Sequence, residues 1–146
     1  MIDNYDLERF VKAQRNNHLI ALFEIKKGKK MNHWMWYVFP QLKGLGRSST
    51  AIFYAIKSKQ EAITYLKHPI LGKRLLEISN ELLKVENRNS KDIFGWTDAL
   101  KLKSSMTLFA AIQTKEKVFR EILIKFYDCK ECLKTIEMLQ QDNEIK

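Results

Sequence analysis

Apolar side chains recur every three or four residues along most of this 146-residue chain, and this spacing limits the possible folds more than any other feature. The longest such stripe consists of Leu71, Leu75, Ile78, Leu82 and Val85, which would share one face of a helix. Comparable spacing marks residues 7–14, 18–27, 59–67, 98–113, 118–126 and 132–139. No segment alternates apolar and polar residues convincingly, as a strand does. We therefore predict an all-α fold, a compact bundle of about seven to eight helices with one irregular aromatic loop.

The chain has the length of a single domain, and neither a repeat nor a low-complexity linker divides it. We expect one helical domain over residues 1–146. The longest apolar run, residues 34–40, is far shorter than the roughly 20 residues that a membrane-spanning helix needs. The first residues carry acids instead of the bases and apolar stretch of a secretory signal. These features predict a cytoplasmic protein with no membrane partner, and they leave its oligomeric state open.

The irregular stretch, residues 32–46, concentrates aromatic and polar side chains. The rings of Trp34 and Trp36 are flat surfaces on which a base or a sugar could stack. His33 can transfer a proton near neutral pH, and Gln41 can hydrogen-bond an amide-like edge. The alternative is that these large side chains only fill space beneath the helices, and composition alone favours that interpretation.

A glycine-containing turn, Gly44-Leu45-Gly46-Arg47, follows directly and leads into a helix that Ser48 or Ser49 can cap. Glycines let backbone N–H groups approach a ligand, and an arginine can form two hydrogen bonds with a phosphate. The turn matches neither the phosphate loop of nucleotide hydrolases nor the dinucleotide fingerprint. An ordinary capped turn is the alternative, but the neighbouring aromatic rings favour a nucleotide-like ligand.

A second unusual segment places Ser104, Ser105 and Thr107 within one helix, where such residues weaken the helix unless their hydroxyls are used. A lysine could activate Ser105 for nucleophilic chemistry. The alternative is that small polar residues allow two helices to pack closely, and the residue types favour this one.

The net charge of +9 favours acidic partners. However, the chain has many more lysines than arginines, which is more typical of a surface that keeps a protein soluble than of specific phosphate recognition. We therefore predict no sequence-specific nucleic-acid binding. Cys129 and Cys132 form half of a zinc pattern without a second pair, so we expect free thiols, no metal and no cofactor.

Residues throughout the chain resemble one known family, domain-of-unknown-function family 1810. The matching motifs include Tyr5-Asp6-Leu7, His33-Trp34-Met35-Trp36, Phe39-Pro40-Gln41-Leu42, Gly44-Leu45-Gly46, His68-Pro69, Ile93-Phe94-Gly95 and Ser104-Ser105-Met106-Thr107-Leu108-Phe109. The resemblance implies a compact, mainly helical bacterial protein without an accepted reaction, some members being labelled calpastatin. The sequence departs from the family pattern at Asn32, at Trp96-Thr97 and at the two cysteines. The last departure weighs against a metal or redox role.

The family signature falls on the aromatic segment and on the serine-rich helix, which suggests one pocket between them. We predict that it holds a small anionic, nucleotide-like ligand, and we leave open whether an enzyme acts on that ligand there. The residues predicted as catalytic are His33, Gln41 and Ser105. Those predicted to bind the ligand are Trp34, Trp36, Gly44, Gly46, Arg47, Ser104 and Thr107. The alternative function is a non-enzymatic module that binds nucleic acid or a protein partner through its basic surface.

Overall fold

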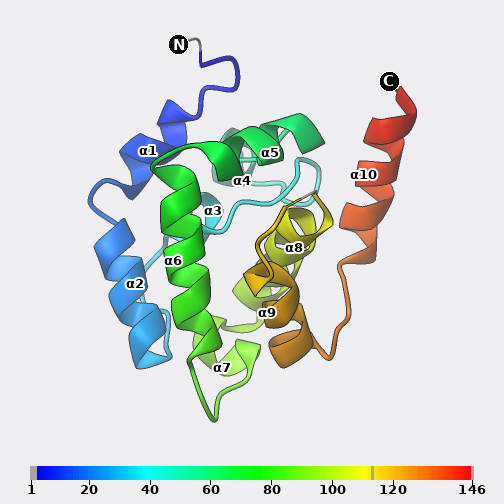
Figure 1. Cartoon of the computed structure of the whole chain (residues 1–146). Helices are drawn as coiled ribbons and strands as arrows, with labels where there is room; N and C mark the ends of the chain where they lie inside the picture. Colours follow the sequence, from blue (N-terminus) through cyan, green and yellow to red (C-terminus); the bar gives the residue numbers. More distant parts are fainter. Residues whose placement is uncertain (1–2, 113, 146) are drawn as a thin grey trace.

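The computed structural model describes residues 3–112 and 114–145, and within these ranges every regular element is a helix. The ten helices, shown in Figure 1, are α1 (Glu8–Gln14), α2 (His18–Lys27), α3 (Met35–Val38), α4 (Ser49–Phe53), α5 (Lys59–Lys67), α6 (Leu71–Leu83), α7 (Ser90–Phe94), α8 (Trp96–Ala111), α9 (Val118–Tyr127) and α10 (Leu133–Ile145). The predicted all-α class is confirmed. The number of helices exceeds the expected seven to eight because short helices such as α3 and α7 form between the longer ones. The expected end of α8 at Gln113 lies outside the described residues.

Helix α6 is central to the packing and carries four of the five residues of the apolar stripe that the sequence predicted, whereas Val85 follows the end of the helix. Leu71, Leu75, Ile78 and Leu82 are each at most 2% exposed. The helix packs against α2, α5 and α9, and Figure 1 shows it running beside α2 and α9. Burying each of these side chains contributes roughly 1.5–3 kcal/mol, so the stripe holds three neighbouring helices together.

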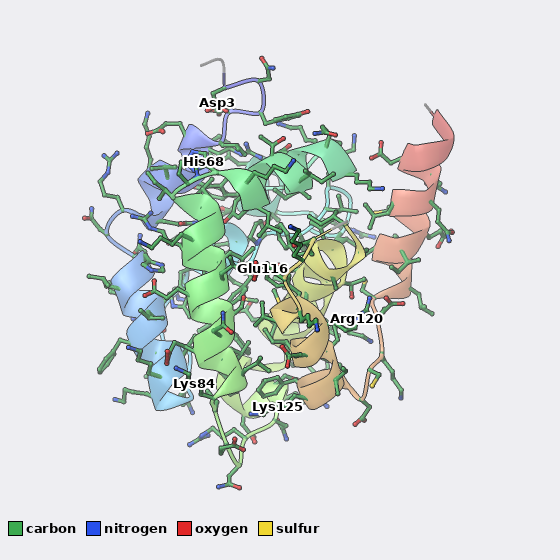
Figure 2. The ribbon with its side chains drawn as sticks, in the orientation of Figure 1. Asp3, His68, Lys84, Glu116, Arg120 and Lys125 are labelled. Carbon is green, nitrogen blue, oxygen red and sulfur yellow. The ribbon has the colours of Figure 1, made fainter. Side chains whose placement is uncertain are left out.

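Both ends of α6 are closed by side chains (Figure 2). At its start, Nδ1 of the His68 ring accepts hydrogen bonds from two backbone N–H groups at 3.1 and 3.2 Å. At its end, Nζ of Lys125 in α9 donates to the carbonyl oxygens of Leu83 and Val85 at 2.5 and 2.7 Å. These bonds satisfy backbone groups that have no partner inside the helix, so both ends of α6 are well defined.

Aromatic rings join the N-terminal and C-terminal halves of the core. The Phe10 ring of α1 meets Tyr65 of α5 edge to face, with 5.1 Å between ring centroids. Phe109 of α8 lies 5.6 Å from Tyr65 and also 5.6 Å from Phe119 of α9. Because such contacts stabilise beyond the area they bury, they fix α8 between α5 and α9.

A buried ion pair connects α1 to the region between α4 and α5. The guanidinium of Arg9 lies 2.9 Å from the Glu61 carboxylate, with both side chains almost fully buried. The same guanidinium donates to the carbonyl oxygens of Phe53 and Ala55, each at 2.9 Å. Burying a charge is costly unless it is paired and hydrogen-bonded, and here these partners meet the requirement. The pair therefore fixes where α4 ends and α5 begins.

Helix α10 lies at one edge of the molecule (Figure 1), reached through a segment that follows α9. It packs against α8, with Thr135 fully buried and Leu139 7% exposed. None of the described helices is long and apolar enough to cross a membrane.

Candidate functional site

The carboxylate of Glu24 organises the start of the aromatic segment. Its Oε1 accepts hydrogen bonds from the backbone N–H groups of Met31 at 2.7 Å and Asn32 at 3.0 Å, and from the Trp34 indole at 2.8 Å. Its Oε2 accepts from the Asn32 side-chain amide at 2.5 Å. Although burial raises the pKa of Glu24, these donors lower it overall, so the group is an anion that holds the segment in place.

Trp34 is therefore part of the core, contrary to its predicted role as a stacking surface. The side chain is 1% exposed, and Phe39 and Phe94 pack around its ring with centroid distances of 6.2 and 6.4 Å. Lys30 covers it as well, with Nζ 5.0 Å from the ring centroid. The alternative that the sequence analysis left open, filling of space beneath the helices, is correct for this residue.

Trp36, in α3, and Gln41, which follows α3 in the chain, lie at a small hollow between α3, α4 and α8. Both line it together with Lys101, whose Nζ lies 5.3 Å from the Trp36 ring centroid. The hollow has a volume of about 10 Å³, which is about the space of one water molecule. This arrangement brings two predicted site residues together, but it leaves no room for a larger ligand.

A much larger cavity lies beside this hollow, between the glycine-containing turn, the start of α5 and α10. Its volume is about 860 Å³, within the range of small-molecule sites. Gly44, Gly46 and Arg47, which were all predicted to bind a ligand, line it. The remaining lining residues are Leu42, Lys43, Ile52, Ala55, Lys57, Ser58, Lys59, Met138, Leu139, Gln141 and Asp142.

Local geometry fixes the glycine turn against this cavity. A single parallel bridge closes its base, because Lys43 N–H donates to the Ile56 carbonyl and Ile56 N–H donates to the Gln41 carbonyl, each at 2.9 Å. Gly44 has φ +90°, a conformation that strains other residues. At Gly46 a Cβ would lie 2.6 Å from that of Ala51, so the close approach of the turn to α4 requires glycine.

The cavity combines an apolar wall with a cationic rim. Lys43, Arg47, Lys57 and Lys59 supply four positive charges. In the part of the chain that the structure describes, none of the four forms an ion pair within 4.0 Å. The opposing charge is Asp142 of α10, whose Oδ2 accepts a hydrogen bond from the backbone N–H of Lys59 at 3.0 Å. The rim therefore attracts anions, and the wall favours a partly apolar ligand.

The serine-rich segment of α8 does not line this cavity, nor does it line the smaller hollow. Ser105 is fully buried, and its hydroxyl has no hydrogen-bond partner among the described residues. Ser104 and Thr107 instead contact Cys132 in the turn before α10. His33, predicted as catalytic, is exposed and lies outside both. The expected convergence of Trp36 and Ser105 on one concavity is therefore not found there.

Sequence reasoning missed the contributions of α5 and α10 to the cavity. Ser58 caps the start of α5, because its hydroxyl accepts a hydrogen bond from the Glu61 N–H at 3.1 Å. Nothing in the sequence indicated that Met138, Leu139 and Asp142 would lie opposite the glycine turn, because residues nearly one hundred positions apart carry no local signal. The apolar spacing of residues 132–139 predicted a buried face for α10, which is correct for Leu139 but not for Leu133, whose side chain is 78% exposed.

Comparison with known proteins agrees with the fold and adds no activity. No protein of curated function matches the chain. The crystal structure of the conserved hypothetical protein Rv1873 from Mycobacterium tuberculosis is similar, with a TM-score of 0.93 and 44% sequence identity over 94% of this chain and 99% of that chain. A family model described as "Protein of unknown function (DUF1810)" matches residues 4–139. The chain therefore belongs to the DUF1810 family of proteins of unknown function.

Proposed function

We propose that this protein binds a small anionic, nucleotide-like ligand in the cavity between the glycine turn, α5 and α10. The observation that carries the proposal is the cationic rim of Lys43, Arg47, Lys57 and Lys59 around a cavity of about 860 Å³. Four cations without ion-pair partners in the described structure are repelled by one another, and an anion would relieve that repulsion.

The shape and chemistry of the wall support a ligand that is more than a bare anion. Leu42, Ile52, Met138 and Leu139 contribute apolar surface to the same cavity as the four cations. Small-molecule sites usually combine a mostly apolar lining with a few polar groups that fix orientation. A nucleotide matches this pattern, because its phosphate would meet the rim while its flat base would lie against the apolar wall.

Arg47 gives the sharpest test of the proposal. A hydrogen bond to a charged group contributes about 1.5–3 kcal/mol, so Arg47→Ala should weaken nucleotide binding by roughly tenfold to a hundredfold. The measurement is titration calorimetry with nucleoside mono- and diphosphates, preceded by a thermal-shift comparison of these compounds. Arg15→Ala is the matched control, because Arg15 is exposed, makes only a long contact of 3.9 Å with Glu8 and does not line the cavity.

Two results would contradict the proposal. One is that no nucleotide raises the melting temperature at millimolar concentration. The other is that Arg47→Ala binds nucleotides as tightly as the Arg15→Ala control does.

The alternative, binding of nucleic acid through the basic surface, is separated by its dependence on salt. Nucleic-acid affinity falls steeply with salt because condensed counterions are released, whereas a ligand with one or two phosphates loses far less. Titration with duplex DNA and single-stranded RNA should therefore show only weak binding that disappears at physiological salt. Tight, sequence-dependent binding that survives physiological salt would favour the alternative.

A further inference from the structure

Two hydroxyl groups of the serine-rich segment, those of Ser104 and Thr107, contact a cysteine. The Ser104 hydroxyl of α8, which also lies 3.2 Å from the Leu100 carbonyl oxygen, can donate to the Cys132 thiol across 3.4 Å, and the backbone N–H of Cys132 donates to the Thr107 hydroxyl at 2.9 Å. These contacts join residues 28 and 25 positions apart in the sequence. The segment that the sequence marked as unusual thus surrounds a half-buried thiol.

The start of α10 adds two further groups to this surrounding. The Ile136 N–H donates to the Cys132 carbonyl at 3.2 Å, so Cys132 stands at the N-terminus of this 13-residue helix. Partial positive charge at a helix N-terminus stabilises a nearby anion. Thr135, one turn later, is fully buried, and its hydroxyl has no hydrogen-bond partner among the described residues.

Burial raises the pKa of the Cys132 thiol, but Ser104, Thr135 and the first backbone N–H groups of α10 lower it overall. The thiolate, and not the thiol, is the nucleophilic form of cysteine. Cys132, half-buried beside the Ser104 hydroxyl and the first backbone N–H groups of α10, therefore has the surroundings of a reactive thiol.

A second thiol precedes it by three residues. Cys129 is exposed and free, as Cys132 is also free. Asp128 and Cys129 both have a left-handed backbone, with φ of 52° and 68°, and the Cys129 N–H donates to the Leu123 carbonyl at 3.0 Å. This turn keeps Cys129 at the surface, three residues before Cys132.

We propose that Cys132 is a peroxide-reactive cysteine and that Cys129 is its resolving partner. The Cys132 thiolate attacks one oxygen of hydrogen peroxide, the O–O bond breaks, hydroxide leaves and a sulfenic acid forms. The Cys129 thiol then attacks the Cys132 sulfur, an S–S bond replaces the S–O bond, and water leaves. Sulfur is oxidised and peroxide is reduced. The departure of the two cysteines from the family pattern weighed against a redox role, whereas the contacts around the Cys132 thiol favour one. Neither cysteine lines the proposed ligand cavity.

The proposal is tested by treating the protein with hydrogen peroxide in the presence of dimedone, which traps sulfenic acids. In Cys129→Ser, the adduct should form on Cys132 about tenfold faster than it forms on Cys129 in Cys132→Ser. Ser104→Ala, combined with Cys129→Ser, should slow adduct formation by roughly threefold to tenfold, because a hydrogen bond to the thiolate is lost.

The wild-type chain provides an independent readout that needs no variant. Without dimedone, the intact mass should fall by two hydrogens while the protein stays free of intermolecular disulfides. Trypsin cuts after Lys130, between the two cysteines, so the disulfide should then join two peptides. Faster or equal reaction at Cys129, or oxidation that yields no bond between the two residues, would overturn the proposal.

Discussion

Replacement of Trp34 by phenylalanine separates a structural role for this tryptophan from a binding role. The indole N–H of Trp34 donates to Oε1 of the buried Glu24 carboxylate at 2.8 Å, and the ring is 1% exposed. Phenylalanine keeps an aromatic ring in the core but cannot donate. The change therefore removes one of the four hydrogen bonds that hold the carboxylate.

The expected loss follows from two contributions. A hydrogen bond to a charged group contributes about 1.5–3 kcal/mol to stability. The smaller ring leaves a partial void, which costs roughly another 1 kcal/mol. We therefore expect Trp34→Phe to lower the free energy of unfolding by about 3 kcal/mol, a large part of the roughly 5–15 kcal/mol that is typical of a domain.

Trp36→Phe is the matched control, because Trp36 is only partly buried and no hydrogen bond of its indole is found in the described structure. It should change stability by less than about 1 kcal/mol. Urea unfolding followed by circular dichroism measures both variants, with the denaturant slope checked for constancy. Equal losses for the two variants would refute the assigned role of Trp34. So would a Trp34→Phe protein of full stability.

Two further predictions concern buried contacts. The pKa of Glu24 is lowered from 4.5 in the fold, so its stabilising contribution is complete above that value and is lost as pH falls through the lower folded pKa. Urea unfolding across this acidic range should therefore show that the free energy of unfolding falls more in the wild type than in Glu24→Gln. Equal falls in the two proteins would contradict the stabilising role of the Glu24 carboxylate. Gly72→Ala should lower the melting temperature although alanine favours helices by about 1 kcal/mol, since its Cβ would lie 2.0 Å from the Leu66 carbonyl oxygen. An unchanged or higher melting temperature would show that α6 shifts freely there.

The sequence was sufficient for the fold class because helix formation leaves a local pattern. The spacing of Leu71, Leu75, Ile78 and Leu82 predicted the buried face of α6 directly. It could not predict α3, since the four residues of that helix are too few for any period to appear. Nor could it predict that α4 ends at Phe53, because the parallel bridge between Leu42 and Ile56 is a pairing between distant residues.

The candidate site was predicted only in part, for the same physical reason. Gly44, Gly46 and Arg47 line the cavity, and the sequence singled them out because a glycine turn before a helix is a local signal. Whether Trp34 stacks on a ligand or packs in the core depends on Glu24, ten residues away on another helix. Side chains that meet through tertiary packing can be recognised as unusual in a sequence, but their partners cannot be identified there.

The buried ion pair between α1 and α5 also constrains the order in which this chain can fold during its synthesis. Arg9 emerges from the ribosome 52 residues before Glu61 does. Until then, burial of its guanidinium would leave the charge without its carboxylate, which is strongly unfavourable. The Arg9 guanidinium should therefore stay hydrated, and α1 should not pack fully against the core, until Glu61 of α5 is available. Once Glu61 is present, the same guanidinium can also bind the carbonyl of Ala55, so burial of this face of α1 and the position of one residue of the cavity lining depend on the same charge pair.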